Sequence, residues 1–223
     1  MKGLFATQSL GRHDRDCALL TFDDGPSLEG TPLILDTLRR YGARALFFVI
    51  GSRIERAPHL LRRMIDEGHV IGNHSHRHAT GRSLGLRRYV DDVRRCQEAI
   101  EQVTTIRPTL FRPPLGELSP WTISASYLLG LQCVLWSIDS GDWRIRNHDD
   151  LSACERRLSA RLSQRHLHDI ILLHDEQPWS AMLLDTVLPP LVDRGVDLGN
   201  GVDVLTGRRP IGANKRSQSG LIA

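Results

Sequence analysis

Short runs of apolar residues alternate with longer, helix-like segments from residue 17 to about residue 205. The apolar residues within each run are continuous, which is typical of strands that are buried on both faces of a parallel sheet. We expect strands at 17–22, 45–50, 70–71, 110–111, 133–138, 170–173 and 202–205. Repeated strand and helix units predict an α/β fold, and about seven such strands suit a closed or nearly closed barrel.

The segments between these strands carry the boundary signals of helices. Thr31 is the expected N-cap of the first helix, with Pro32 at its first helical position and Gly42 as its stop. Further helices are expected at 58–67, 84–103, 120–129, 149–165 and 180–193.

The composition and the absence of linker sequences indicate how the chain is divided into domains. Because neither a linker nor a shift in composition interrupts them, residues 17–206 are expected to form one domain, preceded by an N-terminal segment 1–16 and followed by a polar, aperiodic C-terminal tail 207–223. A formal net charge of +3 gives little support for a nucleic-acid partner. No apolar stretch is long enough to span a membrane, and the first residues lack the pattern of a signal peptide, so a cytoplasmic location is the default expectation. No feature indicates an oligomeric state.

Polar residues gather at the ends of the expected strands, where parallel α/β folds carry their active residues. Asp23 and Asp24 follow the first strand, and a histidine cluster follows the third. Within this cluster His74 and His78 are four residues apart, so on a helical turn they would share one face, as paired metal ligands require. Taken alone, two acids after a strand usually form a surface turn, and a histidine cluster is usually a solvated loop.

Together the two segments are more informative than either alone. One carboxylate and two imidazoles make a three-ligand site that suits catalytic Zn²⁺ and, equally, the iron of oxygenases with two histidines and one carboxylate. The second carboxylate favours hydrolysis, because a hydrolase needs a base beside the water that its metal activates.

Three further strand ends fit hydrolysis. Arg112 precedes a rigid Pro-Pro pair and a glycine, which can hold a cation near a carboxylate and offer backbone N–H groups to an oxyanion. Asp139, Asp142 and Trp143 follow the strand expected at 133–138, and His174 ends a very apolar strand. Singly, each has an ordinary structural explanation: a salt bridge for Arg112, a core position for Trp143 and a satisfied strand-end histidine for His174.

The five segments, taken in order, resemble the five motifs of the polysaccharide deacetylases, the NodB-homology domain of carbohydrate esterase family 4. The matching segments are Thr21-Phe-Asp-Asp-Gly-Pro26, His74-Ser-x-x-His78, Arg112-Pro-Pro-x-Gly116, Asp139-x-x-Asp142-Trp143 and Leu172-x-His174. The resemblance covers about residues 17–205, and the compact length is similar to that of chito-oligosaccharide deacetylases. It implies a distorted (β/α)7-type barrel and metal-dependent removal of N-acetyl groups from amino sugars in chitin-like or peptidoglycan-like glycans.

The resemblance also implies roles for individual residues. Asp24, His74 and His78 would bind the metal, Asp23 would be the base that deprotonates the metal-activated water, and His174 would be the acid that protonates the leaving amine. Arg112 would pair with Asp23, and Asp142 would orient His174 and raise its pKa. The backbone N–H of Leu115 would donate to the oxyanion. The pocket for the acetyl methyl group would be lined by Trp143 and Leu172. Many family members have an aromatic residue where Leu115 stands; a backbone donor survives that change, but a sugar-stacking contact does not.

The implied cofactor is a divalent metal, with Zn²⁺ favoured and Co²⁺, Mn²⁺ or Ni²⁺ as alternatives. The implied partner is an N-acetylated amino-sugar glycan. Two other functions remain open at this point: a hydrolase of the same fold that acts on a small non-carbohydrate amide, and a non-catalytic glycan-binding domain. An iron oxygenase is a more distant alternative.

Overall fold

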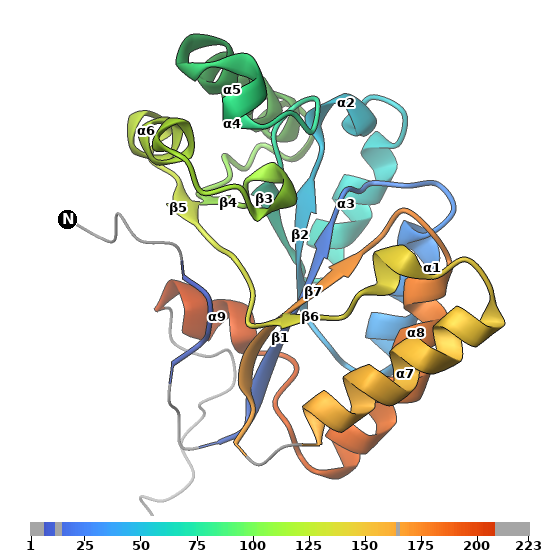
Figure 1. Cartoon of the computed structure of the whole chain (residues 1–223). Helices are drawn as coiled ribbons and strands as arrows, with labels where there is room; N and C mark the ends of the chain where they lie inside the picture. The colour runs from blue at the N-terminus through green and yellow to red at the C-terminus, as the bar shows by residue number, and fades with distance from the viewer. Residues whose placement is uncertain (1–6, 12–14, 164–165, 208–223) are drawn as a thin grey trace, which may run out of the picture.

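Seven parallel strands form one curled sheet in a computed structural model that describes residues 7–11, 15–163 and 166–207 (Figure 1). The strands are β1 Cys17–Asp23, β2 Ala45–Val49, β3 Val70–Asn73, β4 Leu110–Phe111, β5 Gln132–Cys133, β6 Ile138–Asp139 and β7 His168–His174. Their order across the sheet is β5-β4-β3-β2-β1-β7-β6, so β5 and β6 are its two end strands. The predicted distorted barrel is therefore confirmed, as a half-barrel that is open between β5 and β6.

The helices cover the outer face of the half-barrel, except the last one, Gly201–Thr206, whose Val202 packs with Leu19 on the opposite face of the sheet (Figure 1). They are α1 Thr31–Arg40, α2 Gly51–Ile54, α3 Pro58–Asp66, α4 Gly81–Leu84, α5 Leu86–Thr104, α6 Pro120–Leu129, α7 His148–Leu162, α8 Trp179–Asp193 and α9 Gly201–Thr206, together with the 3-10 turns η1 Pro114–Gly116 and η2 Asp142–Arg144. Among the described residues, no helix combines the length and apolar character that crossing a bilayer requires.

Both faces of the sheet are buried, which explains why its strands are continuously apolar. Leu20 and Phe22 of β1 belong to the large cluster that also contains residues of α1, α7 and α8. Leu19, which alternates with them, packs with Phe48 in the cluster on the opposite face of the sheet. Burial of both faces leaves the ends of the strands as the places where polar side chains can reach solvent.

The strand predicted at 133–138 is wrong as one element. Its two ends form β5 and β6, which lie at opposite edges of the sheet, and the residues between them cross the open side of the half-barrel. Here the N–H of Leu135 donates to the carbonyl of Thr7 (2.8 Å), while the carbonyls of Val134 and Leu135 accept from the guanidinium of Arg112 (3.1 and 2.9 Å). At the two ends of this segment the N–H groups of Val134 and Ser137 donate to Phe111 of β4 and Ile170 of β7. An apolar run cannot reveal that its backbone bonds to two different strands, a side chain and a distant segment in turn.

The strand predicted at 202–205 is also wrong, because these residues belong to helix α9. A four-residue apolar run is too short to distinguish the two periodicities. Gly201 lets the first turn of α9 lie against β1, since a Cβ atom there would be 3.0 Å from the Cα of Leu19. Asp203 is fixed by an ion pair with Arg44 (2.9 Å), and Gly207, with φ of +67°, ends the helix.

Other boundaries differ by smaller amounts. The N-cap of α1 is Gly30 and not Thr31, whose hydroxyl instead donates to the buried carboxylate of Asp175 (2.6 Å). The helix predicted at 84–103 is α5, which begins at Leu86 because Gly85, with a φ of +73°, separates it from the short helix α4. The predicted tail lies, beyond residue 207, outside the described residues.

The contact between α9 and β1 can be tested by Gly201→Ala. The added methyl group would meet the backbone and side chain of Leu19 at 3.0 and 2.9 Å, and overpacking of this kind costs about 1–3 kcal/mol. We expect a lower free energy of unfolding in urea denaturation. Gly199→Ala is the matched control, because its nearest neighbour would be 3.7 Å away; equal stability of the two variants would contradict the observed packing.

Candidate active site

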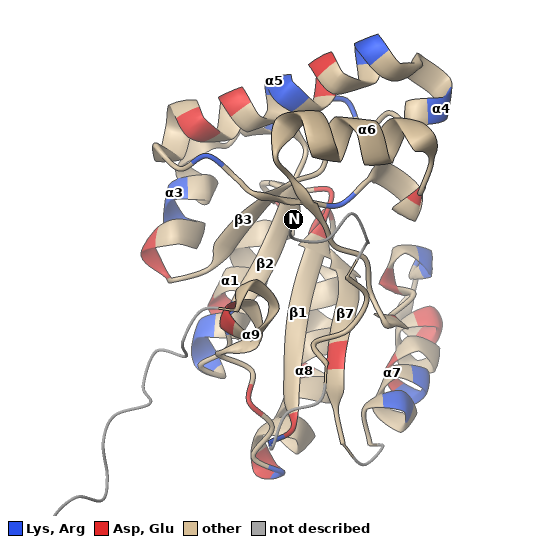
Figure 2. Cartoon of the chain, turned by 90° about the vertical axis from the view of Figure 1, so that its left-hand side faces the viewer, with Lys and Arg blue, Asp and Glu red and all other residues tan. Residues whose placement is uncertain are grey.

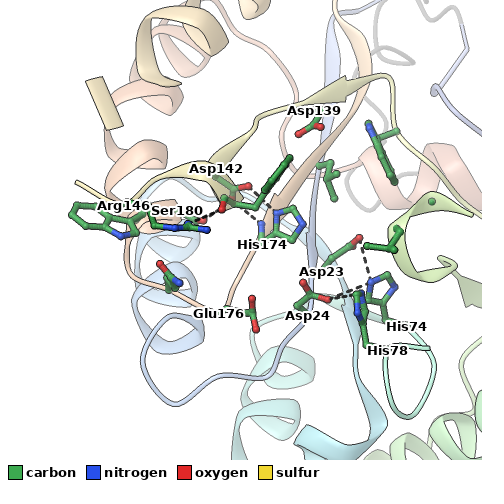
Figure 3. A pocket seen from close by; sticks show the side chains of 17 residues that line it. Asp23, Asp24, His74, His78, Asp139, Asp142, Arg146, His174, Glu176 and Ser180 are labelled. Atoms are coloured by element: carbon green, nitrogen blue, oxygen red, sulfur yellow. Dashed lines mark hydrogen bonds and ion pairs between the residues drawn. The ribbon is translucent and has the colours of Figure 1, made fainter. Parts of the chain in front are cut away.

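Asp24, His74 and His78 form a cluster at the carboxyl ends of β1 and β3 (Figure 3). Each offers one ligand atom, and all three atoms lie within 4.8 Å of one another. Oδ1 of Asp24 is 3.4 Å from Nε2 of His74 and 3.2 Å from Nε2 of His78. The sequence predicts that the two histidines share a helical turn, and this is wrong. They lie in a non-helical loop, with ring centroids 5.0 Å apart.

Two of these three residues hold an unfavourable backbone conformation. Asp24 has a φ of +75° and His78 a φ of +53°, in the left-handed region that non-glycine residues rarely adopt. Neighbouring side chains hold this geometry: Arg53 donates to the carbonyl of Asp24 (2.6 Å), and Oδ1 of Asn73 accepts from the N–H of Ser75 (2.7 Å). Strain that is held in place in this manner is typical of functional sites.

The chemistry of the cluster fits a bound divalent metal. Nδ1 of His74 donates to the carbonyl of Arg112 (2.8 Å), which leaves the lone pair of Nε2 directed at the cluster. Oδ1 of Asp24 is buried and has no hydrogen-bond partner. Burial opposes ionisation of Asp24, but the imidazoles of His74 and His78 outweigh it and hold its pKa well below the usual carboxyl range. Two nitrogen donors and one carboxylate are the ligand set of catalytic zinc sites that keep open positions.

Asp23 lies beside this cluster and is held by Arg112. Both side chains are buried, and the guanidinium donates to Oδ1 of Asp23 at 2.8 Å. The same guanidinium donates to the hydroxyl of Thr21 (2.8 Å) and lies over the ring of Phe48, 4.3 Å from its centroid. Oδ2 of Asp23 is 3.7 Å from Nε2 of His74, so the second oxygen is available to the pocket.

His174 stands opposite the cluster and is fixed by Asp142. The parallel register of β1 and β7 places Asp23 directly beside His174. Oδ1 of Asp142 is 2.8 Å from Nδ1 of His174, and Oδ2 accepts from the backbone N–H of His174 and from the hydroxyl of Ser180 (2.7 and 2.6 Å). Burial opposes the charged imidazolium, but the hydrogen bond and charge of Asp142 outweigh it and raise the pKa of His174 to about 9.

The metal-ligand cluster and His174 line one pocket of about 420 Å³. Leu115, Trp143 and Leu172 also line it, whereas Arg112 lies behind Asp23 and outside the lining. Gly116 of the Arg112 motif lines it as well, and the lining contains further residues that the sequence did not single out: Trp136, Arg146, Glu176, Gln177, Trp179 and Ser180. Trp136 reaches the pocket because its segment crosses the open side of the half-barrel, and Ser180 is tied to the site through Asp142; neither fact has a local signal in the sequence.

A family model described as polysaccharide deacetylase matches residues 11–134. The chain belongs to the polysaccharide deacetylase family. It is 35% identical over 179 residues to the peptidoglycan-N-acetylmuramic acid deacetylase PdaC of Bacillus subtilis, a match that covers 80% of this chain and 36% of that protein. It is 34% identical over 190 residues to the peptidoglycan-N-acetylglucosamine deacetylase PgdA of Listeria monocytogenes, covering 85% of this chain and 39% of that protein. The chain therefore spans under two fifths of the length of these curated relatives.

Solved structures of this polysaccharide deacetylase family share the half-barrel. The peptidoglycan deacetylase PdaC from Bacillus subtilis superposes with a TM-score of 0.76 at 32% identity, over 87% of this chain and 93% of that one. A family 4 carbohydrate esterase from Streptomyces lividans, in complex with acetate, gives a TM-score of 0.73 at 32% identity, over 82% of this chain and 92% of that one. The resemblance predicted from the five motifs is thus confirmed for the family and for the fold.

Substitution of one histidine tests whether Asp24, His74 and His78 bind the metal. We expect the metal-free protein to bind one equivalent of Zn²⁺, and His78→Gln to weaken that affinity by about 100-fold or more because one of three ligands is lost. Calorimetric titration measures both. His76→Gln is the control in the same loop, since His76 is not one of the three clustered ligands; equal losses in the two variants would argue against this cluster as the metal site.

Proposed function

We propose that the chain is a metal-dependent hydrolase that removes N-acetyl groups from amino sugars of a glycan. The observation that carries the proposal is the pocket in which a cluster of metal-ligand type and the His174–Asp142 pair face each other, with Asp23 beside both (Figure 3). Family membership and the names of the relatives support the same reaction.

Asp24, His74 and His78 would hold the metal, with Zn²⁺ favoured by the donor set. When bound, a divalent cation supplies Lewis-acid chemistry, since it acidifies water and polarises a carbonyl oxygen. Asp23 is the base in this proposal. Arg112 occupies one of its oxygens and fixes the carboxylate, and the other oxygen accepts the proton of the attacking water.

His174 is the acid that protonates the departing amine. With a pKa raised to about 9 it carries a proton at neutral pH. Asp142 accepts from both the ring and the backbone N–H of His174, so the direction of the remaining ring nitrogen is fixed. An acid that is charged and oriented before the substrate arrives needs no rearrangement during the reaction.

The acetyl group would lie between η1 and η2. Leu115 has a φ of +60°, is 79% exposed and lines the pocket. Its N–H is the proposed donor to the oxyanion, a role that a backbone amide fills whatever the side chain. Trp143 and Leu172 provide the apolar surface for the methyl group.

The proposed substrate is an N-acetylated glycan of the peptidoglycan type, because the relatives named above act on peptidoglycan sugars. A chitin-like oligomer presents the same N-acetyl group and is the second candidate. Acetate release from peptidoglycan fragments, chito-oligosaccharides and small N-acyl amides distinguishes these substrates from one another. Release of acetate from none of them, with metal bound, would instead favour a glycan-binding domain.

Asp23→Asn tests the base. The substitution preserves the shape of the side chain and removes its ability to take a proton, so we expect kcat to fall by about 100-fold or more while the metal content stays at one equivalent. Acetate release and metal analysis on the same sample provide the measurement. A variant that keeps both its metal and the wild-type rate would exclude Asp23 as the base.

The pH dependence of kcat/KM tests the acid. The pKa of His174 is raised, so its protonated form persists to about pH 9 and the rate should fall as the pH rises through that value. Asp142→Asn removes the charge that causes the shift, so the alkaline limb should move down by about 1–2 pH units. Asp139→Asn, at another carboxylate of the pocket lining, should leave the limb in place. An alkaline limb that does not move in Asp142→Asn would assign it to a different group.

A further inference from the structure

Helix α6 exposes large apolar side chains and buries small or polar ones. The exposed set, here called the α6 face, consists of Leu118, Trp121, Ile123, Tyr127 and Leu128. Tyr127 and Leu128 are 75% and 60% exposed. The buried positions of the helix are Thr122 and Ala125. This arrangement is the reverse of the amphipathic pattern expected for a helix on the surface of a globular domain.

The α6 face belongs to a stretch without charge. Residues 118–138 contain no Asp, Glu, Lys, Arg or His, although 25% of the whole chain is Asp, Glu, Lys or Arg. Figure 2 shows the contrast with the neighbouring helix α5, whose length carries charges of both signs while α6 carries none. At helical spacing Ile123 adjoins Tyr127, and Trp121 lies two turns before Leu128, so the exposed side chains form two neighbouring apolar stripes along the helix. Exposed apolar patches of this kind mark interaction sites.

Basic residues border the α6 face. Helix α4 lies against the start of α6, since a Cβ atom at Gly81 would be 2.7 Å from the Cβ of Trp121. Arg82 of α4 and Arg87 and Arg88 of α5 are exposed, and none of them forms an ion pair with another described residue. The acidic residues near these arginines are Glu117, which accepts from the backbone N–H of Arg82 (3.2 Å), and Asp91 of α5, which pairs with Arg94 (2.6 Å).

The charges around the α6 face indicate which partner would bind it. A second copy of the chain, related by a two-fold axis, would place the same three arginines around both sides of an apolar contact, where like charges repel. An anionic bilayer complements both parts of the surface. Its phosphates attract arginine side chains, and its interfacial region accepts aliphatic groups together with tryptophan and tyrosine, whose polar atoms stay at the level of the headgroups.

We propose that the α6 face, with Arg82, Arg87 and Arg88, docks on the surface of a bilayer that contains anionic phospholipid. The proposal is independent of the deacetylase activity. Its structural consequence is a site presented to the membrane, because α6 follows directly on η1, whose Leu115 forms one wall of the pocket. A glycan held at the membrane by a lipid anchor would then reach the pocket from the side of η1.

Co-sedimentation with vesicles tests the docking. We expect the protein to sediment with vesicles of phosphatidylglycerol and phosphatidylcholine in equal parts, and to bind vesicles of phosphatidylcholine alone about tenfold more weakly. The double variant Tyr127→Gln/Leu128→Gln should lower the partition coefficient on the anionic vesicles by about tenfold or more. Arg87→Gln/Arg88→Gln should do the same and should reduce the dependence of binding on salt.

Matched controls separate docking from general effects of substitution. Met182→Gln/Val192→Gln replaces two exposed apolar residues of α8, and Arg156→Gln/Arg161→Gln replaces two exposed arginines of α7. Both should sediment as the wild-type protein does, and acetate release from a small oligosaccharide measures whether each α6-face variant is folded. Three results would overturn the proposal: no binding of the wild-type protein to anionic vesicles, equal binding of the α6-face variants, or a dimer in solution that the α6-face variants dissociate.

Discussion

The buried guanidinium of Arg112 connects more of this structure than any other group described above. It pairs with Asp23 at 2.8 Å, donates to the carbonyls of Val134 and Leu135, and lies over the rings of Phe48 and Trp136. A buried charge is tolerable only when it is paired and its donors are satisfied, and removing its partner typically costs about 3–5 kcal/mol. The cation therefore fixes the carboxylate of Asp23 and, in the same set of bonds, the segment that crosses the open side of the half-barrel.

The backbone of the same residue orients the imidazole of His74 in the metal-ligand cluster. The carbonyl of Arg112 accepts from Nδ1 of His74, which selects the tautomer whose Nε2 can bind metal. On the opposite side of the pocket Asp142 plays a comparable part for His174, through three hydrogen bonds from two elements. The pocket is thus built from two rigid units, one around Arg112 and one around Asp142. The adjacent strands β1 and β7 join the two units at the level of Asp23 and His174.

The sequence predicts which polar residues share a pocket better than it predicts the bounds of the strands around them. Parallel strands end at one edge of a sheet, so polar residues at strand ends could be brought together without knowledge of the strand order, and Asp24, His74, His78 and His174 do lie in one pocket. Positions set by contacts distant in sequence could not be predicted. The run 133–138 is apolar apart from Ser137, and only its partners at opposite edges of the sheet divide it into two strands. The exposure of the α6 face could not be predicted for a related reason, because a helix that exposes its apolar side has the same residue spacing as one that buries it.

The open side of the half-barrel has a consequence for how the pocket forms. Thr7 bonds to Cys133 and Leu135, and Leu10 bonds to His168, so residues 7–10 span the gap between the two ends of the sheet. These contacts join residues more than a hundred positions apart, and loop closure over such separations is slow compared with local structure. The metal-ligand cluster lies at the ends of the inner strands β1 and β3, whereas the wall carrying Trp136 belongs to the segment that these contacts hold in place. The two halves of the pocket therefore differ in how far they depend on contacts across the open side of the half-barrel.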